Sequence, residues 1–534
     1  MAADNIVFTL LSCLAFMAIV GLVAYFKTRG TTESKDGYFL AGRSLTGTFI
    51  AGSLLLTNLS AEQLIGLNGS AYGFNLSAMA WEVTAGIAII VMALVFLPRY
   101  LNGAFTTLPQ FLEDRFDSGV RRLSAVLFLF GYGLITLPSV LYSGSLAVLK
   151  LFDVPALLGV SMQTGLLLTI FTIGGVGGLY AIFGGLRAVA VSDTLNGVGL
   201  LIVGTLVPLL GLAALGDGSI AAGWQFVITH EPQKLNAIGG ATDPVPFGTL
   251  FTGMLLANLF YWGTNQYVIQ RTLGAASLAE GQKGVLLSGF FKLLIPFFMM
   301  LPGVIAYHLF GNSLSHIDLA YPTLVAAVLP AYLAGFFLAV LLGAVFSSFN
   351  SLLNSAATLF CLDLYQPLKK TRVSDQQLLR VAKIVSLVIA LLSFVAAPLL
   401  QYAPEGLWQI IRVFTGFYNI PIITLVLVGL FTRRVPALAA KVAVGFHIIA
   451  YTLLQFVFDT GIHFIHLYGL LFLAELSLML VIGYVKPAPA AWQYTGSPRV
   501  DMQPWRYAYP TAAALALGIV LVYWLFSSAG IAAS

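Results

Sequence analysis

Long apolar runs follow one another along the chain and constrain its fold more than any other feature. A helix of about 20 residues spans the roughly 30 Å hydrocarbon core of a bilayer. Fourteen such runs lie near residues 5–26, 46–67, 78–101, 123–147, 157–183, 190–215, 248–270, 285–310, 326–360, 382–402, 407–431, 437–457, 464–485 and 507–528. None alternates strictly between apolar and polar residues, which excludes a transmembrane β-barrel. The pattern predicts an all-α integral membrane protein with fourteen transmembrane helices.

Composition agrees with a membrane protein and excludes other classes. Charged residues make up 9% of the 534 residues and apolar residues 59%, which leaves too few polar side chains to cover a soluble protein. Cys13 and Cys361 lie in apolar runs without metal-ligand spacing, so we interpret both as packing residues. The first run has no basic segment before it and no small-residue cleavage site, and we interpret it as an anchor.

Lysine and arginine are distributed unequally between the two sets of loops. With the amino terminus outside, 22 of the 26 basic residues lie on the inner side. Only Lys150 and Lys234 lie outside, while Lys292 and Arg412 fall within runs. Basic loops stay cytoplasmic. The sequence therefore predicts a bacterial inner-membrane protein in the lipid bilayer with both termini periplasmic or extracellular, and it indicates no nucleic-acid partner.

The second and seventh runs carry polar residues at their centres. These are Thr57, Asn58, Ser60, Glu62 and Gln63 in the second run, and Asn258, Tyr261, Thr264, Asn265 and Gln266 in the seventh. Such clusters are costly in hydrocarbon and are typical of broken helices whose free carbonyls ligate an ion. Runs five apart have opposite orientations, as inverted repeats require. We predict repeats over 46–215 and 248–431, with peripheral helices in 1–45 and 437–534.

The ninth run contains two adjacent serines, Ser347 and Ser348. Serines in membrane helices usually bond their own backbone or a neighbouring helix. A hydroxyl pair opposite a broken helix would alternatively complete an all-oxygen site for a hard cation such as sodium. Charged residues inside the runs are further candidates for function: Glu82, Asp193, Lys292, Arg412 and Glu475. We interpret Glu475, in a peripheral run, as structural.

Five longer strings resemble one known family. They are DGYFLAGRSL at 36–45, NLSAEQLIG at 58–66, GGLRAVAVSD at 184–193, NLFYWGTNQYVIQRTLGA at 258–275 and SSFNSLLNSAATLF at 347–360. Together they resemble the sodium/solute symporters, in the branch of the sodium/galactose and sodium/glucose cotransporters. The resemblance runs from about residue 20 to 435. It implies a LeuT-type fold, with runs 2–6 and 7–11 as the two inverted repeats, and sodium as the coupling ion.

The resemblance also implies a sodium site between the break in the second run and the ninth run. Its ligands would be the carbonyls of Leu56, Leu59 and Ala344 and the hydroxyls of Ser347 and Ser348. Asp193 matches an acidic residue near the inner side of the sodium route. Its implied role is a second, weaker contact with the cation.

For a sugar substrate, the matching positions are Gln63, Glu82, Asn258 and Lys292, with Tyr261 as an aromatic inner gate. Sugar hydroxyls both donate and accept hydrogen bonds, so amides, a carboxylate and an ammonium group can each fix one. An aromatic ring can stack on the apolar face of a pyranose and exclude water. The resemblance thus implies a binding site built from four polar side chains and one tyrosine.

Two residues depart from the family pattern. Arg412 stands where sugar transporters commonly have a glutamine, and Ala85 where the galactose transporter has a serine. Because arginine reads carboxylates in bidentate geometry, Arg412 indicates an acidic sugar such as a uronate or sialic acid. Alternatively it pairs with Glu82 or faces the cytoplasmic vestibule, which leaves a neutral sugar or polyol. We favour the neutral substrate, since the other matched positions are unchanged.

Other functional classes agree less well with the sequence. A channel would repeat a short filter, and an intramembrane enzyme would carry a motif such as GxSxG or HExxH. The chain has neither, and it has no Walker A motif for ATP. We predict that it is not an enzyme but a symporter that carries a galactose- or glucose-like hexose into the cell by alternating access. An acidic sugar, inositol or another small organic solute is the alternative.

Overall fold

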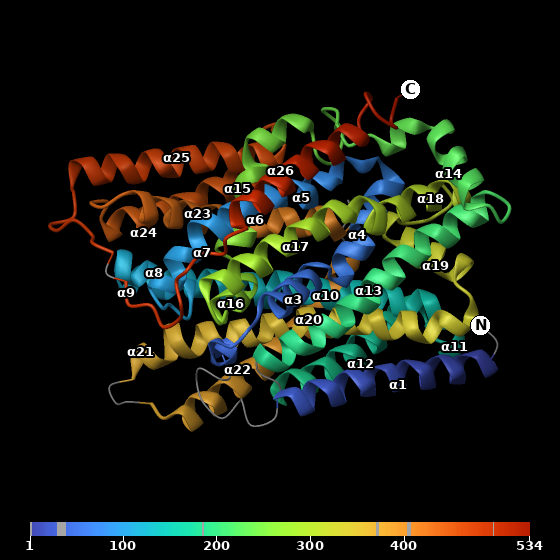
Figure 1. Ribbon diagram of the computed structural model, residues 1–534, viewed down its shortest axis with the longest axis horizontal. Helices are drawn as coiled ribbons and strands as arrows, with labels where there is room; N and C mark the ends of the chain where they lie inside the picture. The colour runs from blue at the N-terminus through green and yellow to red at the C-terminus, as the bar shows by residue number, and fades with distance from the viewer. Residues whose placement is uncertain are drawn as a thin grey trace.

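The computed structural model describes residues 3–28, 39–183, 186–369, 373–402, 407–494 and 496–533. Residues 36–38 and 184–185, which begin two of the five strings, lie outside the described residues. Every regular element in the described ranges is helical, and extended backbone pairs there only at the isolated bridges Leu45–Ala275 and Ser277–Asp501. The helices follow one long axis, and both termini lie at the same end of the bundle (Figure 1).

The α-helices have the following bounds: α1 Ala3–Thr28, α3 Gly47–Asn58, α4 Ala61–Gly73, α5 Ala80–Val83, α6 Ala85–Val91, α7 Leu97–Asn102, α8 Leu108–Arg115, α9 Ser118–Gly131, α10 Leu137–Phe152, α11 Val154–Leu158, α12 Met162–Phe183, α13 Leu186–Leu215, α14 Ile220–Thr229, α15 Gly253–Gly263, α16 Gln266–Leu273, α17 Leu278–Met299, α18 Leu301–Phe310, α19 Ala320–Val328, α20 Ala334–Leu359, α21 Gln366–Leu368, α22 Asp375–Ala396, α23 Leu407–Phe431, α24 Ala437–Thr452, α25 Phe464–Val485 and α26 Ala508–Leu525.

Ten helical stretches within the described residues are long and apolar enough to cross a membrane. They comprise α5–α7, α9–α10, α13, α17–α18, α20–α21, α22, α23, α24, α25 and α26. Each coincides with one of the apolar runs of the sequence. The four other runs form α1, α12 and the helix pairs α3–α4 and α15–α16. The protein is therefore a multi-pass helical membrane protein, and the count of fourteen spans stays a prediction.

The break between α3 and α4 has a local backbone cause. Ser60 adopts an extended conformation, and its N–H donates to the carbonyl oxygen of Asn58 at 2.8 Å. In a continuous helix this N–H would bond to the carbonyl of Leu56, four residues earlier. In the seventh run, α15 ends at Gly263, and Asn265 is extended before α16 begins. Both breaks fall where polar residues interrupt the apolar sequence.

The predicted ninth run, 326–360, is wrong at its start. It joins the end of α19 to α20, although Leu329 and Pro330 leave the helical conformation between them. Proline lacks an N–H donor and disfavours helix in the residue before it, so the chain turns here. Apolar composition alone did not distinguish a turn from a continuous helix, because both sides of the turn are apolar.

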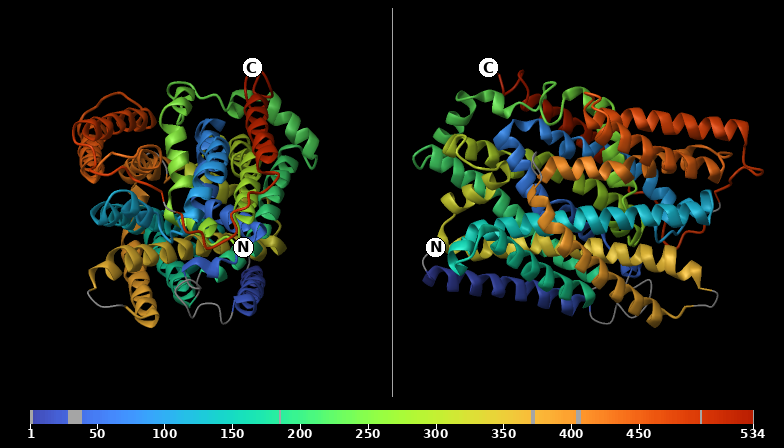
Figure 2. Two further views of the ribbon diagram at one scale, coloured as in Figure 1. Left: turned by 60° about the vertical axis from the view of Figure 1, so that its left-hand side comes forward. Right: turned by 180° about the vertical axis from the view of Figure 1, so that it is seen from behind.

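The two broken pairs lie inside the bundle. Helix α3 packs against α13, α17 and α20, while α4 packs against α10, α18 and α23. In Figures 1 and 2, α1 and α22 lie along one edge of the molecule and α25 along the opposite edge. The short helices α11, α14 and α19 lie at the end that holds both termini, which we call the terminal end, and α8 and α21 at the other end (Figure 1).

Candidate functional site

A small buried cavity of about 40 Å³ lies between α3–α5, α15, α16 and α23, and we call it the central cavity. Four of the six predicted substrate residues line it: Glu82, Asn258, Tyr261 and Arg412. Its polar lining includes Glu62, Asn265, Thr415 and Asn419, and aromatic side chains complete the wall. A space of this size holds only a few water-sized groups. A solute larger than this therefore needs the lining side chains or helices to move before it can enter.

Glu82 connects the two remaining predicted residues to the cavity. Gln63 Nε2 donates a hydrogen bond to Glu82 Oε1 at 2.8 Å, and Lys292 Nζ donates to Glu82 Oε2. The carboxylate is only 2% exposed and the lysine 3%. Buried charges are stable when paired and hydrogen-bonded, and this pairing explains how both are tolerated between α5 and α17. The structure thus brings Gln63, Glu82 and Lys292 together.

Asn258 contacts a hydroxyl that the sequence analysis did not single out. Its Nδ2 donates to Thr84 Oγ1 at 2.9 Å, and Thr84 Oγ1 in turn donates to the Ala80 carbonyl at 2.5 Å. Thr84 immediately precedes Ala85, the residue that this chain has in place of the serine of the galactose transporter. A hydroxyl is therefore present one residue away and orients the Asn258 amide.

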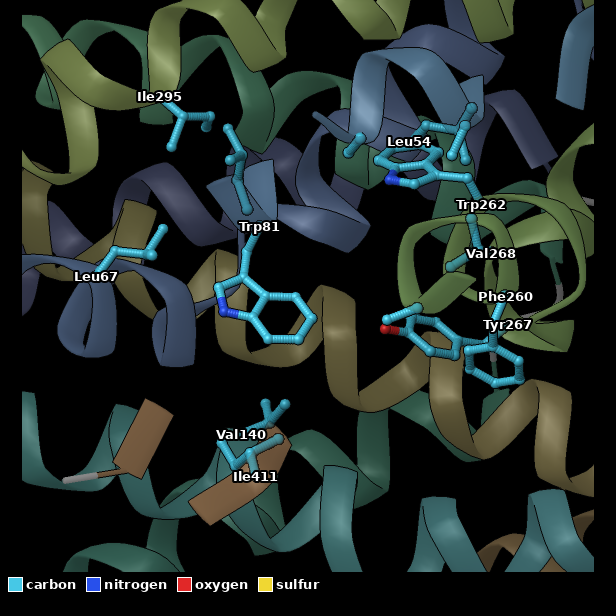
Figure 3. Close-up of a cluster of buried hydrophobic side chains, with 14 of the residues drawn as sticks. Leu54, Leu67, Trp81, Val140, Phe260, Trp262, Tyr267, Val268, Ile295 and Ile411 are labelled. Atoms are coloured by element: carbon cyan, nitrogen blue, oxygen red, sulfur yellow. The ribbon is translucent and has the colours of Figure 1, made fainter. Parts of the chain in front are cut away.

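Tyr261, predicted as a single aromatic gate, belongs to a group of tyrosines. Tyr267 Oη donates to Tyr261 Oη at 2.8 Å, and the Tyr267 backbone N–H donates to Tyr132 Oη at 3.1 Å. The Tyr132 and Tyr267 rings meet edge to face with centroids 5.5 Å apart. In Figure 3 the Tyr267 phenol and the Trp81 indole point toward each other from opposite helices. Tyr261 is thus held by a packed aromatic wall.

Arg412 lies between two indole rings. Its guanidinium carbon is 3.9 Å from the Trp408 centroid and 5.0 Å from the Trp81 centroid. Its Nε is buried without a hydrogen-bond partner among the described residues, and none of the described carboxylates lies within 4 Å of it. The pairing with Glu82 considered from the sequence is wrong, because Lys292 occupies that position. Arg412 lies in the second turn of α23 and lines the central cavity.

Glu62 is a cavity residue that the sequence analysis named only as part of a polar cluster. Its Oε2 accepts a hydrogen bond from Ser139 Oγ at 2.6 Å, and its side chain is buried. Around the cavity, the described charges therefore comprise two carboxylates, Glu62 and Glu82, and two cations, Lys292 and Arg412. With all four side chains ionised, the formal charge of the site is zero.

Unpartnered oxygen atoms gather at the break in the second run. Thr57 Oγ1, Asn58 Oδ1 and Ser60 Oγ are buried and have no hydrogen-bond partner among the described residues. The same holds for the hydroxyls of Ser347 and Ser348 on α20, which packs against both α3 and α4. The Leu56 carbonyl also lacks its helical donor, because the Ser60 N–H bonds to the Asn58 carbonyl instead. Neutral oxygens of this kind suit a hard cation.

Asp193 lies in a fully buried ion pair. Its Oδ2 accepts from Ser53 Oγ at 2.8 Å and lies 3.7 Å from Arg271 Nη2. Arg271 Nε donates to Ser53 Oγ at 2.7 Å, and both charged side chains are 0% exposed. Arg271, one of the 22 basic residues assigned to the inner side, is thus buried near the end of α16, and Asp193 compensates its charge.

A second, larger cavity of about 710 Å³ lies beside the central one. We call it the vestibule and define it by its lining: Gly66, Ser70, Gly73, Phe74, Thr242, Asp243, Pro244, Ser315, His316, Ile317, Asp318, Trp408, Gln409, Val413, Gln455, His463 and Phe464. Two aromatic contacts separate it from the central cavity. Trp408 stacks on Arg412, and Phe464 stacks on Trp81 with centroids 6.4 Å apart.

Comparisons with known proteins agree with this architecture. The model of the sodium:solute symporter family matches residues 38–444. The chain is 45% identical over 515 residues to the uncharacterized symporter YidK of Escherichia coli, covering 96% of this chain and 90% of that protein. It is 33% identical over 448 residues to the sodium/glucose cotransporter of Vibrio parahaemolyticus, covering 80% of each. The fold matches that of a Na⁺-coupled sialic acid symporter in a substrate-bound, outward-open state, with a TM-score of 0.76, 20% identity, and 92% and 99% coverage.

Proposed function

The chain belongs to the sodium:solute symporter family, and we propose that it carries a neutral hexose of the galactose or glucose type into the cell together with sodium. Sodium is the coupling ion, as it is for the family, for the sodium/glucose cotransporter and for the sialic acid symporter. The observation that carries the sugar proposal is the polar group around Glu82, where Gln63, Lys292 and the nearby Asn258 match the positions expected for sugar recognition.

Charge balance supports a neutral substrate. Glu82 is already paired with Lys292, and Glu62 and Arg412 contribute one charge of each sign to the same cavity. An anionic substrate would add an uncompensated charge to a buried site, which is costly in a low-dielectric surrounding. A neutral hexose instead exchanges hydrogen bonds with the side-chain amides and carboxylates without changing the total charge.

Sodium binds, in this proposal, between the α3–α4 break and α20. The carbonyls of Leu56, Leu59 and Ala344 and the hydroxyls of Ser347 and Ser348 supply the ligands. The unpartnered serine hydroxyls and the freed Leu56 carbonyl support this assignment. Asp193 acts as a secondary contact that attracts the ion toward the inner side, while Arg271 offsets its charge when the ion leaves.

Alternating access follows from two inverted repeats, residues 46–215 and 248–431, arranged as fourteen spans with both termini outside. In this orientation the vestibule opens to the periplasm, and the Trp81, Trp408 and Phe464 contacts form the outer barrier. The tyrosine group around Tyr261 forms the inner barrier. Each barrier opens in turn as the repeats move, and the central cavity, about 40 Å³ without a ligand, widens around the bound sugar.

A binding assay with a panel of solutes tests the substrate class. The purified protein is incubated with labelled galactose, with and without sodium, and challenged with glucose, galactose, myo-inositol, glucuronate and sialic acid. We expect the neutral hexoses to displace the label best and only sodium to promote binding. Binding equal in sodium and potassium, or displacement by none of the five, would contradict the proposal.

One observation favours a second candidate, an acidic sugar. The Arg412 guanidinium lines the central cavity and has no carboxylate partner among the described residues. Arginine in that position can bind a substrate carboxylate in bidentate geometry. The same panel distinguishes the two candidates, because an acidic substrate requires glucuronate or sialic acid to displace the label far better than galactose.

A further inference from the structure

We propose that a cavity at the end of the bundle opposite to the terminal end binds the phosphate headgroup of an anionic phospholipid. The cavity has a volume of about 520 Å³, and we call it the α7–α23 pocket. Its described lining comes from α7, from the end of α23 and from the segment between α25 and α26: Arg99, Leu430, Phe431, Arg433 and residues 492–494. None of these residues lines the central cavity or the vestibule. The pocket is therefore separate from the proposed substrate route.

The pocket lies where two membrane-crossing stretches end. The stretch Leu76–Asn102, which contains Arg99, and the helix α23 are both long and apolar enough to cross a membrane. Arg99 lies three residues before the end of the first, and Phe431 is the last residue of the second. The pocket also contains a tryptophan and a tyrosine, residue types that are enriched at the membrane–water interface. The pocket is thus at the depth of lipid headgroups, whichever way the protein is oriented.

Two arginines line the pocket, and none of the described carboxylates lies within 4 Å of either. Arg99 Nη1 donates to the Val95 carbonyl of its own helix at 2.6 Å, and its guanidinium carbon is 6.0 Å from the Phe431 centroid. The Arg433 side chain is exposed and has no hydrogen-bond partner among the described residues. Most N–H donors of both guanidinium groups are therefore available to a ligand.

The charge of the lining selects an anion. Asp114 on α8 accepts a hydrogen bond from Trp492 Nε1 at 3.1 Å, but it does not line the pocket. The described lining thus has two positive side chains and no negative one. The planar fork of an arginine matches two oxygens of a phosphate group. Basic pockets between the ends of membrane helices suit the headgroups of anionic lipids for this reason.

The segment between α25 and α26 is held against both arginine-bearing walls. The Trp492 backbone N–H donates to the Arg433 carbonyl at 2.8 Å, and Tyr494 Oη donates to the Arg99 carbonyl. These contacts join three parts of the chain that are far apart in sequence. The pocket is therefore formed before a ligand binds, which lowers the entropy lost on binding.

A third arginine, Arg115, fixes the turn that carries Arg433. Its Nε donates to the Gly429 carbonyl at 3.0 Å and its Nη1 to the Val435 carbonyl at 3.2 Å, and the side chain is buried. The guanidinium carbon is 5.6 Å from the Trp492 centroid. Arg115 thus determines the position of Arg433 and adds positive charge behind the wall of the pocket.

The rim of the pocket is apolar and suits an amphipathic ligand. The Phe431 side chain is 64% exposed. The chain that leaves α25 passes the same place, because the Ala488 N–H donates to the Arg434 carbonyl at 2.8 Å. Tyr484 and Val485, at the end of α25, are exposed as well. A phosphate between the arginines would therefore have apolar surface beside it for acyl chains, which favours a phospholipid over a soluble phosphate.

Native mass spectrometry of the full-length protein, stripped of lipid in detergent, tests the proposal. Phosphatidylglycerol and phosphatidylcholine with identical acyl chains are titrated separately, and the dissociation constant of the first bound lipid is determined. We expect phosphatidylglycerol to bind the wild type at least about tenfold more tightly than phosphatidylcholine. Arg99→Gln/Arg433→Gln should remove this preference. Arg122→Gln/Arg380→Gln is the matched control and should keep it, because it neutralises two exposed arginines outside the pocket.

Arg433→Gln alone decides the question if the double variant does not fold, because the Arg433 side chain has no partner among the described residues. It should weaken phosphatidylglycerol at least about threefold and leave phosphatidylcholine unchanged. Equal affinities of the wild type for the two lipids, or an unchanged affinity for phosphatidylglycerol in Arg433→Gln, would overturn the proposal. An equal loss in the pocket variant and the matched control would do the same.

Glycerol phosphate and inorganic phosphate distinguish a lipid headgroup from a soluble phosphate. Neither has acyl chains, so we expect neither to displace phosphatidylglycerol at millimolar concentration. Displacement by either one would assign the pocket to a soluble phosphate and overturn the lipid assignment. None of these outcomes depends on which solute the protein transports.

Discussion

At the scale of single residues, the Glu82 group forms the core of the site. Gln63 and Lys292 hold the two carboxylate oxygens of Glu82, and Asn258 is held by Thr84. In the proposed site, a sugar hydroxyl would therefore meet side chains whose orientations are already fixed. Each contact can be tested by removing one side chain, because its partners stay in place on separate helices.

Asn258→Ala tests the sugar site directly. The variant removes an amide that lines the central cavity and leaves Thr84 in place. Loss of one hydrogen bond at a buried site costs about 1–3 kcal/mol, so hexose affinity should fall about tenfold or more. Sodium-dependent binding of labelled galactose measures the effect. Asn236→Ala, in a loop outside the cavity, should bind as the wild type does. An unchanged affinity in Asn258→Ala would remove Asn258 from the site.

Arg412→Gln tests the role of the arginine. On the neutral-sugar account, the guanidinium stabilises the layer between the two cavities by stacking on Trp408 and Trp81. Stacks of this kind are worth about 0.5–2 kcal/mol. The substitution should therefore change the rate of hexose uptake and leave the choice among sugars unaltered. Arg412→Lys keeps the charge without the planar stack and should resemble Arg412→Gln. If Arg412→Gln lost glucuronate or sialic acid uptake while Arg412→Lys kept it, the arginine would be shown to bind a substrate carboxylate.

His463 gives the protein a dependence on pH. Burial and the nearby His466 lower the pKa of His463 from about 6.5 to about 4 in the folded protein. Its Nδ1 also accepts the Ile465 N–H at 3.3 Å, which requires that nitrogen to be unprotonated. Neutral His463 therefore stabilises the folded protein above about pH 6.5, and this stabilisation is lost as the pH falls through about 4.

The thermal unfolding midpoint should accordingly fall between pH 6.5 and pH 4 in the wild type. His463→Asn keeps a capping acceptor but does not titrate, so its midpoint should fall less over the same range. Differential scanning fluorimetry at several pH values makes the comparison. Equal decreases in both proteins would show that His463 does not contribute to the acid sensitivity.

At the scale of helices, the break between α3 and α4 and the facing helix α20 carry the sodium assignment. Ser347→Ala/Ser348→Ala removes two of roughly five proposed oxygen ligands and leaves the backbone carbonyls. The sodium concentration for half-maximal hexose uptake should rise at least about tenfold. Ser393→Ala is the matched control, because its hydroxyl bonds the Ala390 carbonyl of its own helix. A double variant with unchanged sodium dependence would place the ion elsewhere.

Helices α24 and α25 hold the helix that carries Arg412. Tyr451 Oη donates to the Val413 carbonyl at 2.6 Å, and His447 Nε2 lies 3.0 Å from the Gly416 carbonyl. His447 Nδ1 lies 2.5 Å from Glu475 Oε1, and both side chains are fully buried. The interpretation of Glu475 as structural agrees with this contact. The peripheral helices thus fix the position of α23 next to the central cavity.

Much of the fold could be predicted from the sequence, because bilayer thickness sets the length of apolar runs and polar residues mark the breaks. The turn at Leu329 and Pro330 could not, since apolar residues flank it on both sides. Among site residues, the charged and amide side chains stood out inside apolar runs. Glu62 stood out only as one member of a polar cluster. Thr84 and Tyr267 did not stand out, because nothing local distinguishes a polar side chain that lines a cavity from one that bonds a neighbouring helix. Arg271 looked like a loop cation, since its partner Asp193 is 78 residues away in sequence.

At the scale of the whole molecule, the proposed mechanism requires one barrier on each side of the small central cavity. The Trp81, Trp408 and Phe464 layer lies between the vestibule and the central cavity, and the tyrosine group around Tyr261 forms another part of the central wall. In the proposed mechanism, sodium at the α3–α4 break and a sugar beside Glu82 both contact the second run, which contributes Leu56 and Gln63. Movement of this run therefore couples the two ligands in the proposed mechanism.

Sodium-driven accumulation is the most direct test of this coupling. The purified protein is reconstituted in liposomes, and uptake of labelled galactose and of labelled glucose is followed under an inward sodium gradient. We expect at least one of the two hexoses to accumulate above its external concentration, and the accumulation to collapse when a sodium ionophore removes the gradient. With potassium in place of sodium, uptake should equal that of empty liposomes. Accumulation that does not depend on the sodium gradient, or no uptake of either hexose, would contradict sodium-coupled hexose symport.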